Sequence, residues 1–184
     1  MIFKQGKIKF SSYKDPDCKK AVSFFGNDWV GDYEPKKFKL TEGNCFEQSS
    51  VVGSPVKKTI YKGFKPAVLT ITVTLDRSVY KGLSPAIPIS GLPELFPDLE
   101  DSVTKRLEKL EKIVKAYNGS IHSAPYVKVE FGDNPFKGVC TDWKVDKKDF
   151  DRDGELRVAE VFMEFTETMS MELARKQANN QSPD

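Results

Sequence analysis

The sequence predicts an α+β protein that is mainly β, with one long helix packed alongside a sheet. Three observations support this prediction. Apolar and polar residues alternate over three successive segments of residues 125–167, the same alternation runs through residues 67–75, and a long apolar stripe at three- and four-residue spacing lies between residues 98 and 119. Alternation of this kind is typical of strands that pack one face on a core and leave the other face wet.

Residues 125–167 are interpreted as a three-stranded antiparallel meander. Turn-forming residues separate the strands at residues 133–135 and 151–154. The residues predicted to share one face are, strand by strand, Val127, Val129 and Phe131, then Val139, Thr141, Trp143 and Val145, then Ala159, Val161, Met163 and Phe165. The third strand also carries apolar residues on its second face, so we expect it to be an interior strand.

The strand at residues 67–75 is predicted to pack against the helix. Leu69, Ile71, Val73 and Leu75 share the face expected to meet the helix, which leaves Thr70, Thr72 and Thr74 on the opposite face. The helix is predicted to begin at Asp98 or at Asp101-Ser102 and to end at Gly119, a length of about 30 Å. Its apolar stripe consists of Val103, Leu107, Leu110, Ile113, Val114 and Tyr117.

We expect one domain over residues 1–170, with a polar tail at residues 171–184. Within the domain, residues 1–66 are expected to be loop-rich with short strands, and residues 67–167 to form the core. Residues 80–97 are rich in proline but too apolar for a free surface loop, so they should lie against their own domain or a neighbouring subunit. We predict a subunit interface there, formed by Leu83, Ile87, Ile89 and Leu92.

Composition excludes several function classes. With 29 basic and 27 acidic residues, the net charge of +2 provides no overall field for binding nucleic acid. Three widely spaced cysteines and a single histidine indicate a reducing compartment and predict no zinc site. No apolar run is long enough to span a membrane, and no nucleophile motif surrounds any serine, so we predict neither membrane insertion nor enzymatic activity, and no cofactor.

Four stretches together resemble the tube-fold domain of contractile injection systems and phage tails. They are LTITVTLDRS at residues 69–78, KAYNGSIHSAPYVKVEFG at residues 115–132, FKGVCTDWKV at residues 136–145 and FDRDGELRVAEVFMEFTE at residues 150–167. The likeness is greatest to the tube-initiator or spike-adaptor proteins of the baseplate. Ala124 and Phe131 depart from the proline and tryptophan often found in that family. No LysM module is expected after residue 170, so a stand-alone adaptor is expected.

The resemblance implies a β-sandwich or open barrel with one long helix alongside, assembled as a hexameric ring. The implied function is structural: the ring joins the trimeric spike hub to the inner tube protein and initiates tube assembly, in contact with other baseplate proteins. Strands of such rings line a channel, which assigns Thr70, Thr72 and Thr74 to the lumen. The implied location is the bacterial cytoplasm during assembly, then the tail-like particle or virion.

A calcium loop is the sharpest competing interpretation. Asp149, Asp151, Asp153 and Glu160, with Gly154 between them, have the spacing of ligands in a twelve-residue calcium loop. That loop requires flanking helices, whereas the alternation before residue 149 predicts a strand and therefore a hairpin turn. A calcium-binding or small-ligand-binding β protein is the alternative function.

Overall fold

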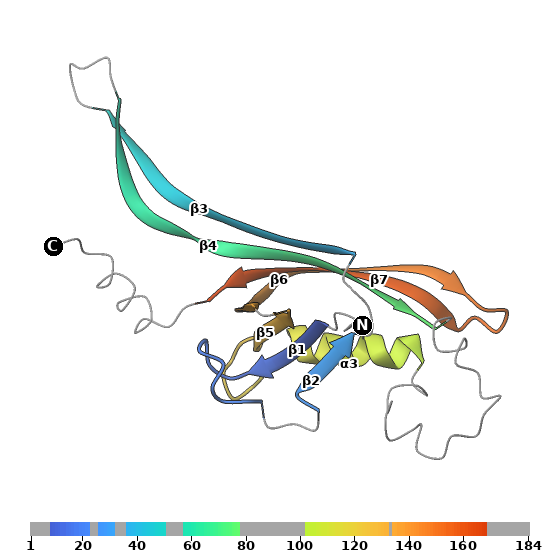
Figure 1. The fold of residues 1–184 in the computed structure, drawn as a ribbon. Coiled ribbons are helices and arrows are strands. Elements are labelled where there is room, and N and C mark those ends of the chain that lie inside the picture. Colours follow the sequence, from blue (N-terminus) through green and yellow to red (C-terminus); the bar gives the residue numbers. More distant parts are fainter. Residues whose placement is uncertain are drawn as a thin grey trace, which may run out of the picture.

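The computed structural model describes residues 8–22, 26–31, 36–50, 57–77, 102–132 and 134–168. This part of the chain forms one antiparallel sheet of seven strands, in the order β2-β1-β5-β6-β7-β4-β3, with helix α3 against one face (Figure 1). The strands are β1 (Ile8–Tyr13), β2 (Asp28–Gly31), β3 (Lys37–Ser50), β4 (Lys57–Asp76), β5 (Tyr126–Phe131), β6 (Asn134–Phe150) and β7 (Leu156–Glu167), and α3 spans Val103–Lys115. The predicted class, α+β and mainly β, is confirmed.

The sheet folds over on itself into an open barrel. Phe10 on β1 and Phe165 on β7 have ring centroids 6.0 Å apart, although the two strands are three positions apart in the sheet. A flat sheet would separate such strands by about 14 Å. The fold occurs along β6, where Gly138 pairs with Val127 on one side and with Glu167 on the other. A side chain at this corner would meet the backbone oxygen of Thr166 at 2.4 Å, so only glycine fits.

The core lies between α3 and the folded sheet. The predicted packing of the strand at residues 67–75 against the helix is confirmed, because both apolar sets belong to one buried cluster. Its members include Leu69, Ile71, Val73 and Leu75 from β4, Leu107, Leu110 and Val114 from α3, and Val161, Met163 and Phe165 from β7. Burying each such side chain stabilises the fold by about 1.5–3 kcal/mol.

Helix α3 is shorter than predicted. Ser102 caps its start, with Oγ accepting a hydrogen bond from the backbone N–H of Lys105 at 3.3 Å. The helix ends at Lys115 and not at Gly119, because Ala116 is extended and the next residues form their own turn, closed by a bridge between Asn118 and Ser123. Tyr117 therefore leaves the apolar stripe and is 70% exposed.

Two further predictions need correction. The described residues between positions 36 and 66 do not form short strands and loops: β3 has 14 residues, and the strand predicted at residues 67–75 is the second half of the 20-residue β4. In the meander, the register of β6 shifts between Cys140 and Asp142, so Thr141 is skipped. Cys140, and not Val139, therefore packs on the core with Trp143 and Val145.

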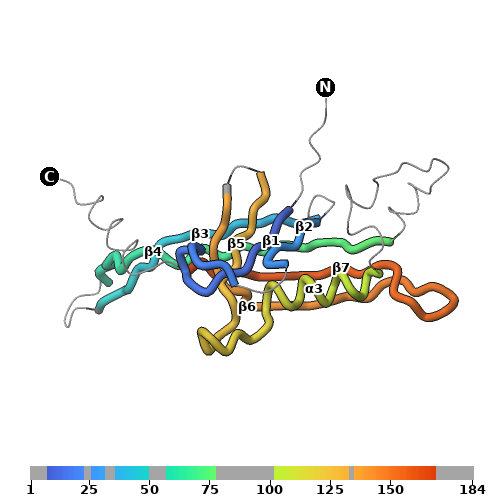
Figure 2. Tube along the Cα trace, turned by 90° about the horizontal axis from the view of Figure 1, so that it is seen from below, coloured from blue at the N-terminus to red at the C-terminus, as the bar shows by residue number. Residues whose placement is uncertain are grey.

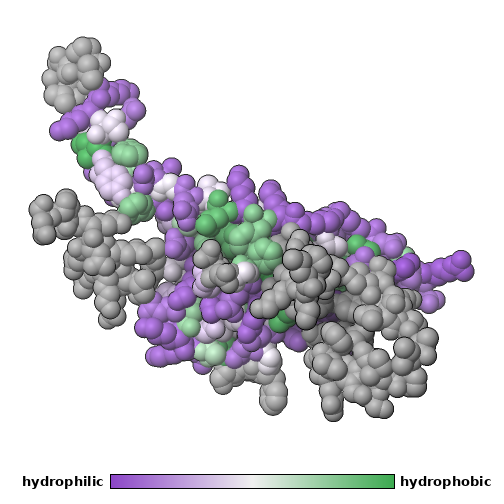
Figure 3. Space-filling model, in the orientation of Figure 1, coloured by the Kyte–Doolittle hydropathy of each residue, from purple (hydrophilic) through white to green (hydrophobic). Residues whose placement is uncertain are grey.

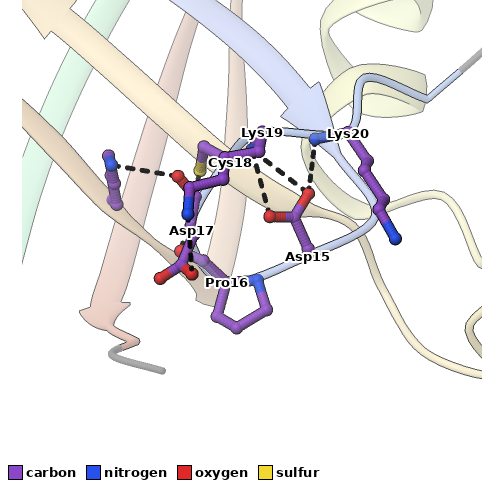
Figure 4. Close-up of polar contacts among 7 residues, drawn as sticks. Asp15, Pro16, Asp17, Cys18, Lys19 and Lys20 are labelled. Atoms are coloured by element: carbon purple, nitrogen blue, oxygen red, sulfur yellow. Dashed lines mark hydrogen bonds and ion pairs between the residues drawn. The ribbon is translucent and has the colours of Figure 1, made fainter. Parts of the chain in front are cut away.

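Residues 14–20, which follow β1, are held by several hydrogen bonds at one side of the barrel. The Asp15 carboxylate accepts hydrogen bonds from the backbone N–H groups of Lys19 and Lys20, at 3.0 and 2.6 Å (Figure 4). Lys137 Nζ donates to the backbone oxygen of Asp17 at 3.0 Å, which links the loop to β6 next to the Gly138 corner. This contact fixes residues 15–17 beside the corner.

Candidate assembly surfaces

The face of the sheet opposite α3 carries mainly polar side chains in rows that cross the strands. Thr72 pairs with Lys37 on β3 and with Phe162 on β7, and Phe162 pairs with Lys144 on β6. We call this row and its two neighbours the polar face. The neighbouring rows are Lys39, Thr70, Glu164 and Asp142, and then Thr74, Glu160 and Asp146. The structure thus places Thr70, Thr72 and Thr74 together on the face directed away from the core.

Glu160 connects three parts of this surface. Its carboxylate accepts a hydrogen bond from Lys36, which precedes β3, and Lys148 Nζ on β6 lies 2.6 Å from its other oxygen. Lys148 and Lys36, by hydrogen bonding, hold the pKa of the Glu160 carboxyl below its usual value of 4.5. Glu160 is therefore ionised at neutral pH, and the pairs persist down to acidic pH.

Another ion pair of the polar face joins Lys144 and Asp142 within the subunit. Lys144 Nζ lies 2.5 Å from the Asp142 carboxylate and 5.2 Å from the centroid of the Phe162 ring. The hydrogen bond to Lys144 lowers the pKa of Asp142. Opposite charges thus compensate each other locally, and the face combines high polarity with little net field.

Beyond the end of β7, β3 and β4 continue as a two-stranded ribbon. β4 pairs with β7 from Val68 to Asp76, whereas its pairing with β3 extends to Lys57. We call residues 43–50 and 57–65 the arm. It projects from one end of the molecule in both views (Figures 1 and 2), and nearly all its described side chains are exposed. A two-stranded hairpin buries too little surface to be stable by itself, so the arm is suited to docking on a partner.

Three aromatic rings contact one another on the arm. Phe46 and Tyr61 pair across the strands with ring centroids 5.6 Å apart, and Phe64 lies 5.9 Å from Tyr61. We call these residues the aromatic trio. They are 56%, 50% and 65% exposed, and apolar side chains interrupt the hydrophilic surface along the arm (Figure 3). Neighbouring apolar side chains that are exposed in this way often mark a site of protein–protein interaction.

The turn between β6 and β7 lies at the opposite end of the molecule. We call residues 149–155 the acidic turn. The Asp151 carboxylate accepts hydrogen bonds from the backbone N–H groups of Asp153 and Glu155, at 3.0 and 2.9 Å, and Arg77 at the end of β4 lies 2.6 Å from the Glu155 carboxylate. These contacts make the turn rigid, and Phe150 beside them is 51% exposed.

The structure does not bring the four possible calcium ligands together. Glu160 belongs to the polar face, where it pairs with lysines, while Asp151 stabilises the acidic turn through the backbone. Within the described residues, no cluster of His, Cys, Asp or Glu side chains has an arrangement that could hold a metal ion. The predicted interface residues Leu83, Ile87, Ile89 and Leu92 lie outside the described residues.

Sequence reasoning missed two features of these surfaces. The aromatic trio was assigned to a loop-rich region, although Gly53, Ser54 and Pro55 between two β-forming segments are a hairpin signal. The pairing of Glu160 with two lysines was missed because its partners are 124 and 12 residues away in the chain. Only the strand order brings Lys36, Lys148 and Glu160 into contact.

The described residues thus form a sheet with one buried face and one polar face, and an exposed arm extends from it. This arrangement suits a subunit that contacts other subunits. Comparison with known protein families identifies which assembly. The family described as contractile injection system tube protein matches residues 4–176, so the chain belongs to this family. No curated protein matches the chain. The resemblance noted from the sequence is thereby confirmed, and the protein is a tube-type component that assembles with other parts of a tail-like particle.

Proposed function

We propose that this protein is a structural subunit that forms a hexameric ring between the trimeric spike hub and the inner tube, and that it initiates tube assembly. It has no enzymatic activity in this role. Membership of the tube family supports assembly with other tail components. Among the described residues, no helix has the length and apolar character required to cross a membrane. The subunit would assemble in the bacterial cytoplasm and then become part of the tail-like particle or virion.

The polar face is the observation that carries this proposal. A wall around a water-filled channel needs one face packed on its own subunit and one face that tolerates water. β4 meets both needs, because Ile71 is fully buried against the core while Thr70, Thr72 and Thr74 alternate with the buried residues on the other side. We assign these three threonines to the lumen.

Charge pairing on the polar face fits a channel through which cargo passes. Unpaired lysines in a narrow lumen would hold polyanions, and unpaired carboxylates would hold basic segments. Glu160 and Asp142 neutralise the lysines around them within the same subunit. The six-fold repeat of this face would therefore be polar without attracting charged cargo strongly. We further propose that Leu83, Ile87, Ile89 and Leu92 contribute to the contact between adjacent subunits of the ring.

The test combines the mass of the assembly with the accessibility of position 72. Mass photometry of the protein, alone and with its spike-hub and tube partners, should show a species of six 20.8-kDa chains. In a Cys45→Ser background, Thr72→Cys should react with a small thiol reagent in monomer and ring alike. A maleimide carrying a long polyethylene-glycol chain should react with the monomer only, because the lumen of the ring excludes it.

Lys112→Cys, on the described surface of α3 opposite to the polar face, is the matched control. It should react with the bulky maleimide in both states. A chain that remains monomeric with its partners present would contradict the ring. A ring in which Thr72→Cys stays open to the bulky reagent would contradict the lumen assignment alone.

A further inference from the structure

The arm and the acidic turn differ in charge. The arm contains four lysines and one acidic residue, namely Lys57, Lys58, Lys62 and Lys65 against Glu47. The acidic turn contains four carboxylates and one basic residue, namely Asp149, Asp151, Asp153 and Glu155 against Arg152. Lys62 pairs with Glu47 inside the arm at 2.8 Å, which leaves the other three lysines to set its charge. Arg77 and Arg157 reduce the excess on the acidic turn, and Asp153 is exposed there.

The two surfaces also match in apolar character. The aromatic trio is at least half exposed on the arm, and Phe150 is half exposed beside the acidic turn. Aromatic side chains are enriched at the centres of protein interfaces, and polar residues surround them at the rim. The arm thus carries a positive excess, the turn carries a smaller negative excess that includes the exposed Asp153, and both surfaces carry exposed aromatic rings.

The arm and the acidic turn of one chain cannot meet each other. They lie at opposite ends of the molecule in both views (Figures 1 and 2). β4 joins them directly: its 20 residues begin in the arm, and Arg77, just after its last residue, contacts Asp151 and Glu155. An extended strand of that length spans about 65 Å. A contact between unlike surfaces of two copies is heterologous, so it repeats from copy to copy.

We propose that the arm of one copy docks on the acidic turn of a second copy, with lysines facing carboxylates and Phe150 against the aromatic trio. This inference rests on the proposed function, since a tube-type ring must contact further copies. It names the acceptor surface for the arm and gives the contact a direction. The partner is therefore another copy of this chain, and not the spike hub.

Cross-linking through the native Cys45 tests the contact. Cys45 is exposed on the arm, whereas burial raises the pKa of the Cys18 and Cys140 thiols to about 11, so Cys45 reacts first at neutral pH. The variant Asp153→Cys adds one thiol to the acidic turn. A short bifunctional thiol reagent should then join copies into a ladder of dimers, trimers and higher multimers, because each copy presents one arm thiol and one turn thiol.

Two controls define the contact. Wild type has only the reactive arm thiol, and Cys45→Ser with Asp153→Cys has only the turn thiol, so neither should form a ladder.

Charge reversal tests the same contact without a cross-linker. Reversal of arm charge by Lys58→Glu with Lys65→Glu should weaken self-association about tenfold or more. The further substitutions Asp149→Lys and Asp153→Lys should restore it. The same number of reversals on α3, Lys105→Glu with Lys112→Glu, should leave self-association unchanged.

The outcomes separate this inference from the proposed function. If wild type assembles but the Asp153→Cys variant gives no ladder, the arm-to-turn contact is overturned and the ring is left intact. Cross-linked dimers of wild type would show that the arms of two copies contact each other. Cross-links only to the spike hub would show that the arm binds that partner. Either result overturns the inference. Failure of wild type to assemble in any condition would contradict the ring itself.

Discussion

Glu160 shows how one side chain organises a surface assembled from distant parts of the chain. It is 17% exposed in the middle of the polar face and holds Lys36 and Lys148 from two sides. Surface ion pairs each stabilise a fold by up to about 1 kcal/mol. Their greater effect here is to neutralise lysines that would otherwise project from this face. A single substitution at Glu160 therefore changes the charge of the surface more than the stability of the fold.

The variant Glu160→Gln should reveal this pairing through pH. Because the pKa of Glu160 is lowered in the folded protein, its contribution to stability is complete above the usual value of 4.5 and is lost as pH falls through the lowered value. The difference in free energy of unfolding between wild type and Glu160→Gln should be constant from pH 5 upward, at about 1 kcal/mol or less. It should shrink below about pH 4. Urea unfolding across this range measures it, and a difference that grows on acidification would contradict the ion pairs.

At the scale of elements, the sequence correctly predicted those helices and strands whose residues follow a regular local spacing. The helix stripe from Val103 to Val114 and the buried alternation of residues 69–75 are confirmed, because each is determined by spacing within a single segment. β3 was missed because Phe38 and Leu40 alternate for only a few residues before the register shifts between Thr41 and Gly43. The shift at Thr141 was missed for the same reason: a bulge is set by the partner strand, which no local period records.

A substitution at the Gly138 corner should lower the free energy of unfolding markedly, although it adds only one methyl group. Gly138→Ala places a methyl group against the Thr166 backbone oxygen at 2.4 Å and the Phe136 ring at 2.8 Å. We expect a loss of about 1–3 kcal/mol in the free energy of unfolding. Gly119→Ala is the matched control, since no atom lies within 4 Å of its added carbon. Equal midpoints of denaturation for the two variants would show that the corner can relax.

At the scale of the whole molecule, the described part of the chain divides into a packed barrel and a projecting arm. The barrel holds the buried cluster, whereas nearly every described side chain of the arm is exposed. The ring and its partners were predicted from the resemblance and not from any residue pattern, because the residues of an assembly surface do not recur at a regular spacing in the sequence. The aromatic trio became visible as a surface only when β3 and β4 were seen to extend past β7.

Removal of the arm should therefore leave the barrel folded. Replacing residues 43–65 with a two-residue Asn-Gly turn closes β3 onto β4 as a short hairpin. The free energy of unfolding should change by about 1 kcal/mol at most, as for changes remote from the core, while self-association should be lost. Thermal unfolding and sedimentation measure the two effects separately. A shortened chain that fails to fold would show that the arm belongs to the folding unit.

β4 gives the molecule a mechanical property as well as a shape. β4 is a single strand from the arm to Asp76. From Val68 to Asp76 it pairs with β7 on one side and, as far as Thr72, with β3 on the other. A pull on the arm along this strand would load the flanking hydrogen bonds in shear, all at once, and would not peel them apart one by one. The same pull applied across the strand would separate the ribbon from its free end. A subunit tethered through its arm would thus resist force along β4 far better than force across it.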